Sequence, residues 1–128
     1  KRILSSKQKQ KHNFSLGQHG EALAAQYLVD QGYEVVATNV RVGNHEADLI
    51  ALDKELNELI FVEVKTRQSD EYGEPSYAVD QDKLKSLQIV AKNYCRAHQI
   101  RIDYRFDIIT VISGKIEHYE NVTWLFKK

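Results

Sequence analysis

The sequence predicts an α/β fold, in which a mixed β-sheet is flanked by helices within a single domain. Two amphipathic segments and five extended segments follow one another in the order α-β-β-β-α-β-β, which favours a sheet with helices packed on it. The chain has 128 residues, within the usual size of one domain that buries its own core. Apolar residues make up 42% and charged residues 28% of the sequence, which excludes wholesale disorder.

The first helix is predicted from Leu16 to Gln31, where apolar residues recur on one face and Gly32 follows as a stop signal. Residues 1–15 precede it as a tail rich in Lys, Gln and Ser, and residues 16–128 form the domain. Five basic residues in this tail come before the first acidic residue, Glu21. We interpret the tail either as a basic arm that contacts phosphates or as a flexible, solvated leader.

Three consecutive strands are predicted next, because each segment is rich in β-branched or other apolar residues and polar turn-formers separate them. They span Tyr33–Val40, His45–Leu52 and Leu59–Arg67. Residues 67–79 contain Gly73 and the only proline, Pro75, which predicts a loop. Its two tyrosines either lie near a substrate or hold the loop against the domain; they are Tyr72 and Tyr77.

A second helix is predicted to begin near Asp80, with Asp80 or Asp82 as its N-cap. Its apolar stripe consists of Leu84, Leu87, Val90, Ala91 and Tyr94, and Cys95 lies beside the stripe as core filling. A β-branched strand at Arg105–Ile112, a turn at Ser113-Gly114 and a return strand at Lys115–Tyr119 complete the predicted order.

Two neighbouring strands carry charges inside apolar runs. Because side chains alternate along a strand, Glu46 and Asp48 share one face of the second strand, and Glu63 and Lys65 share one face of the third. The opposite face is apolar and is expected to be core; it consists of Ala47, Leu49, Ala51, Ile60, Val62 and Val64. On the charged face, apolar residues cover the half next to the hairpin loop, so this face is expected to open only at its charged end.

The register of this hairpin predicts that the charged groups converge. If residues 53–58 form the loop, counting back along both strands places Asp48 opposite Glu63. The same count places Glu46 opposite Lys65. Directly opposed like charges destabilise a strand pair. The Lys65 ammonium offsets part of this repulsion, and a bound divalent cation with oxygen ligands offsets the rest. The alternative is a surface ladder of salt bridges, in which Glu46 pairs with Lys65 and Asp48 with a lysine or arginine elsewhere.

Such a site has the groups needed to cut a phosphodiester. Asp48 and Glu63 would hold Mg²⁺ or Mn²⁺, with the backbone carbonyl of Val64 as a further ligand, and the ion would activate a water molecule. Lys65 would orient that water or stabilise the negative charge that builds up on phosphorus. We therefore expect a nucleic-acid substrate and no nucleophilic side chain.

An acid followed by Glu-x-Lys on the next strand, with an acidic residue on a preceding helix, resembles the PD-(D/E)XK nuclease superfamily. More specifically, six motifs in order are similar to those of the YraN family of small endonuclease-like proteins. They are Gly20-Glu21-Ala22, Gly32-Tyr33, Asn39-Val40-Arg41, Glu46-Ala47-Asp48-Leu49-Ile50-Ala51, Phe61-Val62-Glu63-Val64-Lys65-Thr66-Arg67 and Arg105-Phe106-Asp107. The resemblance covers nearly everything from Gly17 to Trp124.

This resemblance implies a restriction-endonuclease-like αβββαβ core and a site similar to that of Holliday-junction resolvases. It also implies that Glu21 reaches the metal from the first helix; the residues alone suggest only a helix-dipole partner at this position. Ala47 stands where the superfamily has a proline before the metal-binding aspartate. Four basic residues are expected to contact phosphates or to form salt bridges; they are Arg41, Arg67, Lys83 and Arg105.

The leading interpretation is a Mg²⁺- or Mn²⁺-dependent endonuclease that acts on DNA, including branched DNA, in preference to RNA. The alternatives are a non-catalytic module that binds nucleic acid or a protein partner, and a metal-dependent phosphodiesterase acting on small nucleotides. Zinc is not expected, because only Cys95 and His98 have ligand-like spacing. A single cysteine and the lack of an apolar leader favour the cytoplasm. We expect no membrane partner and leave open a homodimer.

Overall fold

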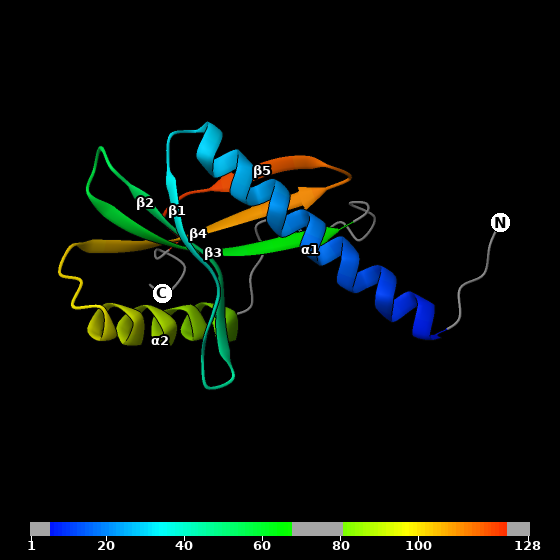
Figure 1. The fold of residues 1–128 in the computed structure, drawn as a ribbon, viewed down its shortest axis with the longest axis horizontal. Coiled ribbons are helices and arrows are strands. Elements are labelled where there is room, and N and C mark those ends of the chain that lie inside the picture. Colours follow the sequence, from blue (N-terminus) through cyan, green and yellow to red (C-terminus); the bar gives the residue numbers. More distant parts are fainter. Residues whose placement is uncertain (1–5, 68–80, 123–128) are drawn as a thin grey trace.

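The computed structural model describes residues 6–67 and 81–122. Within these ranges the elements are α1 (Ser6–Asp30), β1 (Glu34–Val42), β2 (His45–Asp53), β3 (Glu58–Arg67), α2 (Gln81–Ala97), β4 (Asp103–Ile112) and β5 (Lys115–Tyr119). The predicted order and the α/β fold class are confirmed. The five strands form one sheet in the order β1-β2-β3-β4-β5, in which β3 and β4 are parallel and the other neighbours antiparallel (Figure 1).

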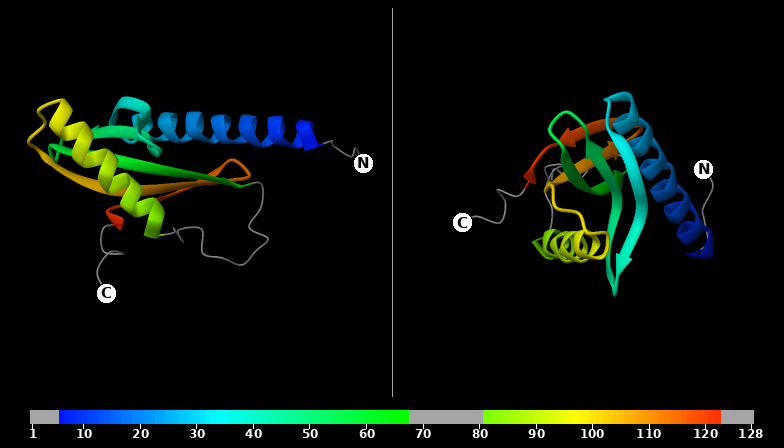
Figure 2. Two further views of the ribbon diagram at one scale, coloured as in Figure 1. Left: turned by 90° about the horizontal axis from the view of Figure 1, so that it is seen from below. Right: turned by 60° about the vertical axis from the view of Figure 1, so that its left-hand side comes forward.

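The two helices cover opposite faces of the sheet, each over its own hydrophobic cluster (Figure 2). The α2 cluster includes Ile50, Phe61, Leu84, Leu87 and Ile108, and the α1 cluster includes Leu28, Leu49, Ile60, Val62 and Ile109. Because alternate residues of β2 and β3 enter different clusters, the predicted alternation is confirmed over the paired part of the hairpin.

Ala47 departs from this alternation. It was predicted to share a face with Leu49, but it packs in the α2 cluster, whereas Leu49 packs in the α1 cluster. The antiparallel register between β2 and β3 runs from Asp53↔Glu58 to Leu49↔Val62, so Ala47 lies beyond it. There β2 is paired only with β1 and twists away from β3, and simple alternation no longer predicts which face a residue occupies.

Helix α1 begins at Ser6, ten residues before the predicted start at Leu16. Residues 6–15 are therefore helical, and the predicted start of this helix was wrong. The stretch holds one apolar residue, Phe14, so it has no periodicity to detect. Its Lys and Gln residues have good helix propensity and extend the packed helix. The N-terminal part of α1 projects beyond the sheet (Figures 1 and 2).

The other predicted boundaries agree with the structure to within two residues. The loop predicted at 67–79 lies outside the described residues from position 68 onward, together with Tyr72, Tyr77 and the N-cap candidate Asp80. Cys95 is half-buried against the α2 cluster, as predicted for core filling, and burial raises the pKa of its thiol. Neither helix in the described ranges combines the length and apolar character needed to cross a membrane.

A close approach between α1 and β3 sets the position of the first helix. A Cβ atom at Gly20 would lie 2.0 Å from the Thr66 Oγ1 atom, well inside the distance that real Cβ atoms show. Only glycine therefore lets the helix backbone come this close to the strand. Since Glu21 follows Gly20, the same contact fixes where the Glu21 side chain leaves the helix.

Candidate functional site

The candidate site lies where the β2–β3 ladder ends. Leu52 pairs with Leu59, as predicted, and the last pair is Leu49↔Val62. Asp48 and Glu63 follow one residue beyond this pair. The Asp48 Oδ2 atom accepts a hydrogen bond of 2.8 Å from the backbone N–H of Val64. The Asp48 side chain thus caps the end of the ladder.

Asp48 and Glu63 are close enough to perturb each other. Burial raises the pKa of Glu63 to about 7, and the neighbouring Asp48 charge adds to this rise. Burial also raises the pKa of Asp48, although the hydrogen bond from Val64 favours its ionised form. Ionising both carboxyls without a cation is therefore unfavourable.

Two further carboxylates come from other positions. Carboxylate oxygens of Glu21 in α1, Glu46 in β2 and Asp48 in β2 all lie within 4.8 Å of one another, and we call these three residues the carboxylate cluster. Burial raises the pKa of Glu21, and the Asp48 charge contributes in the same direction. The structure therefore places the Glu21 carboxylate of α1 beside Asp48 and Glu46 of β2.

Asn39 of β1 links two members of the carboxylate cluster. With its amide oriented to satisfy both groups, its nitrogen lies 3.2 Å from Glu46 Oε1 and 3.2 Å from Glu21 Oε2 and donates to both. Its φ of 50° lies in the left-handed region, which asparagine adopts more readily than most residues. Sequence reasoning quoted Asn39 in the Asn39-Val40-Arg41 motif and assigned it no role; a further signal was an asparagine inside a β-branched strand.

Glu46 does not face Lys65, so this prediction was wrong. The two strands have separated at that level, and Glu46 pairs instead with Arg41 of β1, its register partner, at 2.8 Å between Oε2 and Nε. The Arg41 side chain is 73% exposed. Lys65 is half-buried on β3, beside Thr110 of β4.

Lys83 supplies a positive charge from the second helix. Its Nζ atom lies 3.3 Å from Glu63 Oε1, and the Glu63 charge raises the pKa of Lys83. Lys83 was expected to be either a phosphate contact or a salt-bridge partner, and the structure shows the salt bridge. The Lys83 side chain is 63% exposed, whereas the Glu63 side chain is 11% exposed.

A cavity of about 410 Å³ lies between the beginning of β2 and the first turns of α2. The hydrogen bond between His45 Nδ1 and Ser86 Oγ, 2.9 Å long, joins these two elements. The cavity is lined by Asn44, Glu46, Asp48, Glu63, Asp82, Lys83 and Ser86. Most of its walls are therefore polar groups that can bind a cation or a hydrated ligand.

Arg67 and Arg105 lie away from this cavity. Arg67 lines a separate cavity of about 340 Å³ beside His19 and Gly20. Arg105 is 6% exposed, and its Nε atom lies 3.0 Å from Asp107 Oδ1 and its Nη1 atom 3.1 Å from Glu58 Oε1. Arg105 was expected to be either a phosphate contact or a salt-bridge partner, and its buried guanidinium forms the salt bridges.

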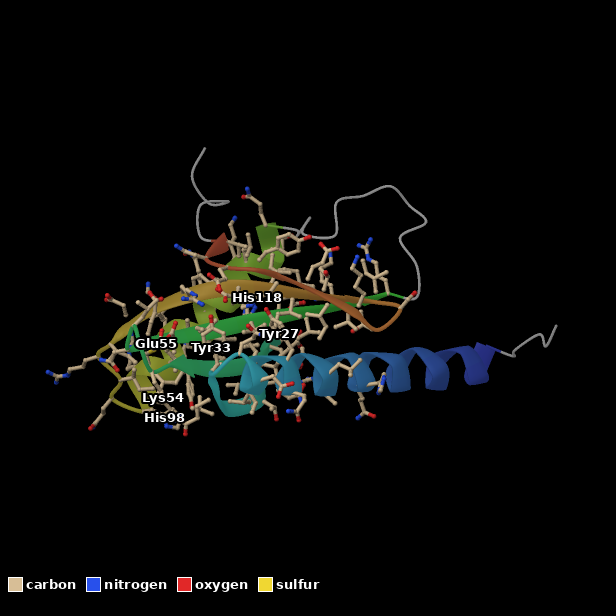
Figure 3. All side chains as sticks on the ribbon, turned by 90° about the horizontal axis from the view of Figure 1, so that it is seen from above. Tyr27, Tyr33, Lys54, Glu55, His98 and His118 are labelled. Atoms are coloured by element: carbon tan, nitrogen blue, oxygen red, sulfur yellow. The ribbon has the colours of Figure 1, made fainter. Side chains whose placement is uncertain are left out.

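The Arg105 network joins the strands to α1. His118 Nε2 lies 2.7 Å from Asp107 Oδ2, and Tyr27 contacts the other ring nitrogen of His118 at 3.0 Å (Figure 3). Burial alone would raise the pKa of Asp107, but hydrogen bonds from His118 and Arg105 and from the backbone N–H of Asn121 hold it below its usual value. Asp107 is fully buried and ionised, so this network supports the fold.

The fold and the site define a small single-domain α/β protein with a restriction-endonuclease-like αβββαβ core and several carboxylates at the end of a strand pair. Residues 20–111 match the Uncharacterised protein family UPF0102. The chain belongs to this family, which is the YraN family that the motifs resemble.

Curated relatives match most of the chain. A UPF0102 protein of Alkaliphilus metalliredigens is 44% identical over 110 residues, which cover 84% of this chain and 95% of the relative. A UPF0102 protein of Paenarthrobacter aurescens is 40% identical over 113 residues, covering 84% and 92%. A third, from Thermodesulfovibrio yellowstonii, is 39% identical over 106 residues, covering 83% and 93%. Their names state no activity.

Proposed function

We propose that this protein is a divalent-metal-dependent endonuclease that hydrolyses phosphodiester bonds in DNA. The observation that carries the proposal is the convergence of Glu63 with the carboxylate cluster at the end of the β2–β3 ladder. Surface salt bridges would leave the carboxyls ionised at little cost. Here burial and mutual repulsion raise the pKa of Glu21, Asp48 and Glu63 instead.

The donor set fits a hard cation. Its groups are carboxylate oxygens, which Mg²⁺ and Mn²⁺ prefer as ligands. Asp48, Glu63 and Glu21 would hold the ion, with the Val64 carbonyl as a further ligand. When bound, the ion would polarise a phosphoryl oxygen and acidify a water molecule.

Lys65 would act on the phosphate rather than on the cation. It lies two residues after Glu63 on β3, and a strand places such residues on the same face. Its ammonium would orient the attacking water or stabilise the charge that develops on phosphorus. The exposed Arg41 side chain and the Lys83 side chain, both beside the carboxylates, would contact neighbouring phosphates of an extended substrate.

A panel of labelled substrates tests the proposal. Duplex DNA, single strands, flaps, four-way junctions and RNA would be incubated with Mg²⁺ or Mn²⁺ and, in parallel, with excess EDTA. We expect metal-dependent cleavage of at least one DNA substrate by the wild type and by Glu55→Gln, a control in the exposed β2–β3 turn (Figure 3). We expect none by Asp48→Asn.

Two outcomes would contradict the proposal. Undiminished cleavage in EDTA would exclude the metal-dependent mechanism. Tight binding of DNA with no cleavage of any substrate would favour the non-catalytic binding module instead.

A further inference from the structure

We infer that Lys83 is the resident counterion of the site and that a divalent cation must displace it from Glu63 before Glu63 becomes a ligand. This inference rests on the proposed metal site, and it adds a residue of α2 that controls how readily the site takes up its ion.

The positions of the four carboxylates support the displacement. Glu21, Glu46 and Asp48 have oxygens within 4.8 Å of one another, and among the described residues this group does not include Glu63. Glu63 instead bonds to Lys83 Nζ at 3.3 Å. Glu63 therefore contacts Asp48 on one side and is held by the ammonium on the other.

Lys83 is the partner that can move. Glu63 belongs to β3, between two strands, and is nearly buried, whereas about two thirds of the Lys83 side chain is exposed. A lysine side chain can swing its head group into water while its stem stays against the protein. If the Lys83 ammonium moved away from Glu63, no apolar core would be exposed. The Lys83 side chain would remain in the wall of the cavity.

Charge decides the direction of the exchange. The ammonium brings one positive charge to the carboxylates, and a divalent cation brings two at shorter distances, so its attraction is stronger. A partly exposed lysine–glutamate pair is weak and yields to such a competitor. The Lys83 charge would nonetheless weaken metal binding, because each binding event must break this pair.

Calorimetric titration with Mn²⁺ tests the inference without any substrate. Lys83→Gln should lower the Kd for Mn²⁺ on the order of threefold to fivefold, the scale of one partly exposed ion pair. Lys85→Gln removes the same charge from an exposed position on α2 and should change the Kd by less than about twofold, as expected for a screened surface charge. In the Glu63→Gln background, Lys83→Gln should lower the Kd much less, because the ion pair with Glu63 is gone and only the weaker interactions of Lys83 with Asp48 and Glu46 remain.

The outcomes separate this inference from the proposed function. An unchanged or higher Kd in Lys83→Gln, or an equal effect of Lys85→Gln, would overturn the displacement and leave the metal site intact. An equal change in Kd from Lys83→Gln in the wild type and in the Glu63→Gln background would also overturn the displacement and leave the metal site intact. Absence of Mn²⁺ binding in every variant would overturn the metal site as well. If Glu63→Gln binds too weakly to measure, the comparison of Lys83→Gln with Lys85→Gln decides alone.

Discussion

Glu63→Gln should stabilise the metal-free protein at alkaline pH and lose this advantage at acidic pH. Glutamine keeps the shape of the side chain and cannot ionise. In the wild type, the folded state raises the pKa of Glu63 from 4.5 to about 7, so the folded protein holds this proton more tightly than the unfolded chain. Tighter proton binding by the folded state raises the free energy of unfolding. This increase is fully present below pH 4.5 and is lost as the pH rises through about 7.

The size of the effect follows from the two pKa values. Above pH 7 the wild type pays about 3 kcal/mol to ionise Glu63 in the folded state, and at pH 5 this cost falls below about 1 kcal/mol. The ion pair with Lys83 is already included in this cost, because the lysine charge lowers the pKa of Glu63 toward its value of about 7. We therefore expect Glu63→Gln to be more stable than the wild type by about 3 kcal/mol at pH 8 and by less than about 1 kcal/mol at pH 5.

Urea unfolding followed by circular dichroism in EDTA, at pH 5 and pH 8, measures both differences. Glu55→Gln, whose position is exposed, is the matched control and should follow the wild type at both values. A Glu63→Gln variant that is less stable than the wild type at pH 8 would refute the reasoning. So would a difference between the two proteins that is the same at pH 5 and pH 8.

Three further predictions concern other parts of the molecule. Asp107→Asn should cost about 3–5 kcal/mol in urea unfolding, because it leaves the Arg105 guanidinium buried without its main partner; a loss below about 1 kcal/mol would contradict this. Gly20→Ala should lower the melting temperature through its clash with Thr66, and Thr66→Ala should recover part of the loss; independent effects of the two changes would argue against the contact. Lys65→Ala should abolish cleavage and retain Mn²⁺ binding in calorimetry, because an ammonium is no metal ligand. Equal loss of cleavage and of Mn²⁺ binding would show that Lys65 has another role.

Most of the fold could be predicted from the sequence because hydrophobic periodicity reports which face of an element is buried. The two core faces of β2 and β3 follow from strict alternation, and the stripe on α2 follows from helical spacing. The start of α1 could not be predicted in this way, because Phe14 is the one apolar residue in the sequence from 6 to 15 and leaves no apolar periodicity. Ala47 was misplaced because alternation assumes a continuous ladder, and the β2–β3 ladder ends at Leu49.

The candidate site could be predicted where local geometry determines it. Counting along one hairpin was enough to bring Asp48 and Glu63 together. The partners from other elements depend on tertiary packing, which spacing does not report. Lys83 meets Glu63 only because α2 lies against β2 and β3. The two roles expected for Arg105 could not be separated, because a basic residue gives no sign in the sequence that it will be buried.

The parallel pairing of β3 with β4 divides the sheet into two antiparallel units, β1-β2-β3 and β4-β5. Every carboxylate proposed to bind metal precedes this junction, whereas Arg105, Asp107 and His118 follow it. The proposed metal ligands and the centre of the Arg105 network thus lie in different antiparallel units, and the network reaches across the junction to Glu58 of β3 and Tyr27 of α1. We expect substitutions at Asp107 or His118 to reduce the amount of folded protein in a cell, while the proposed metal ligands stay in place in the molecules that fold.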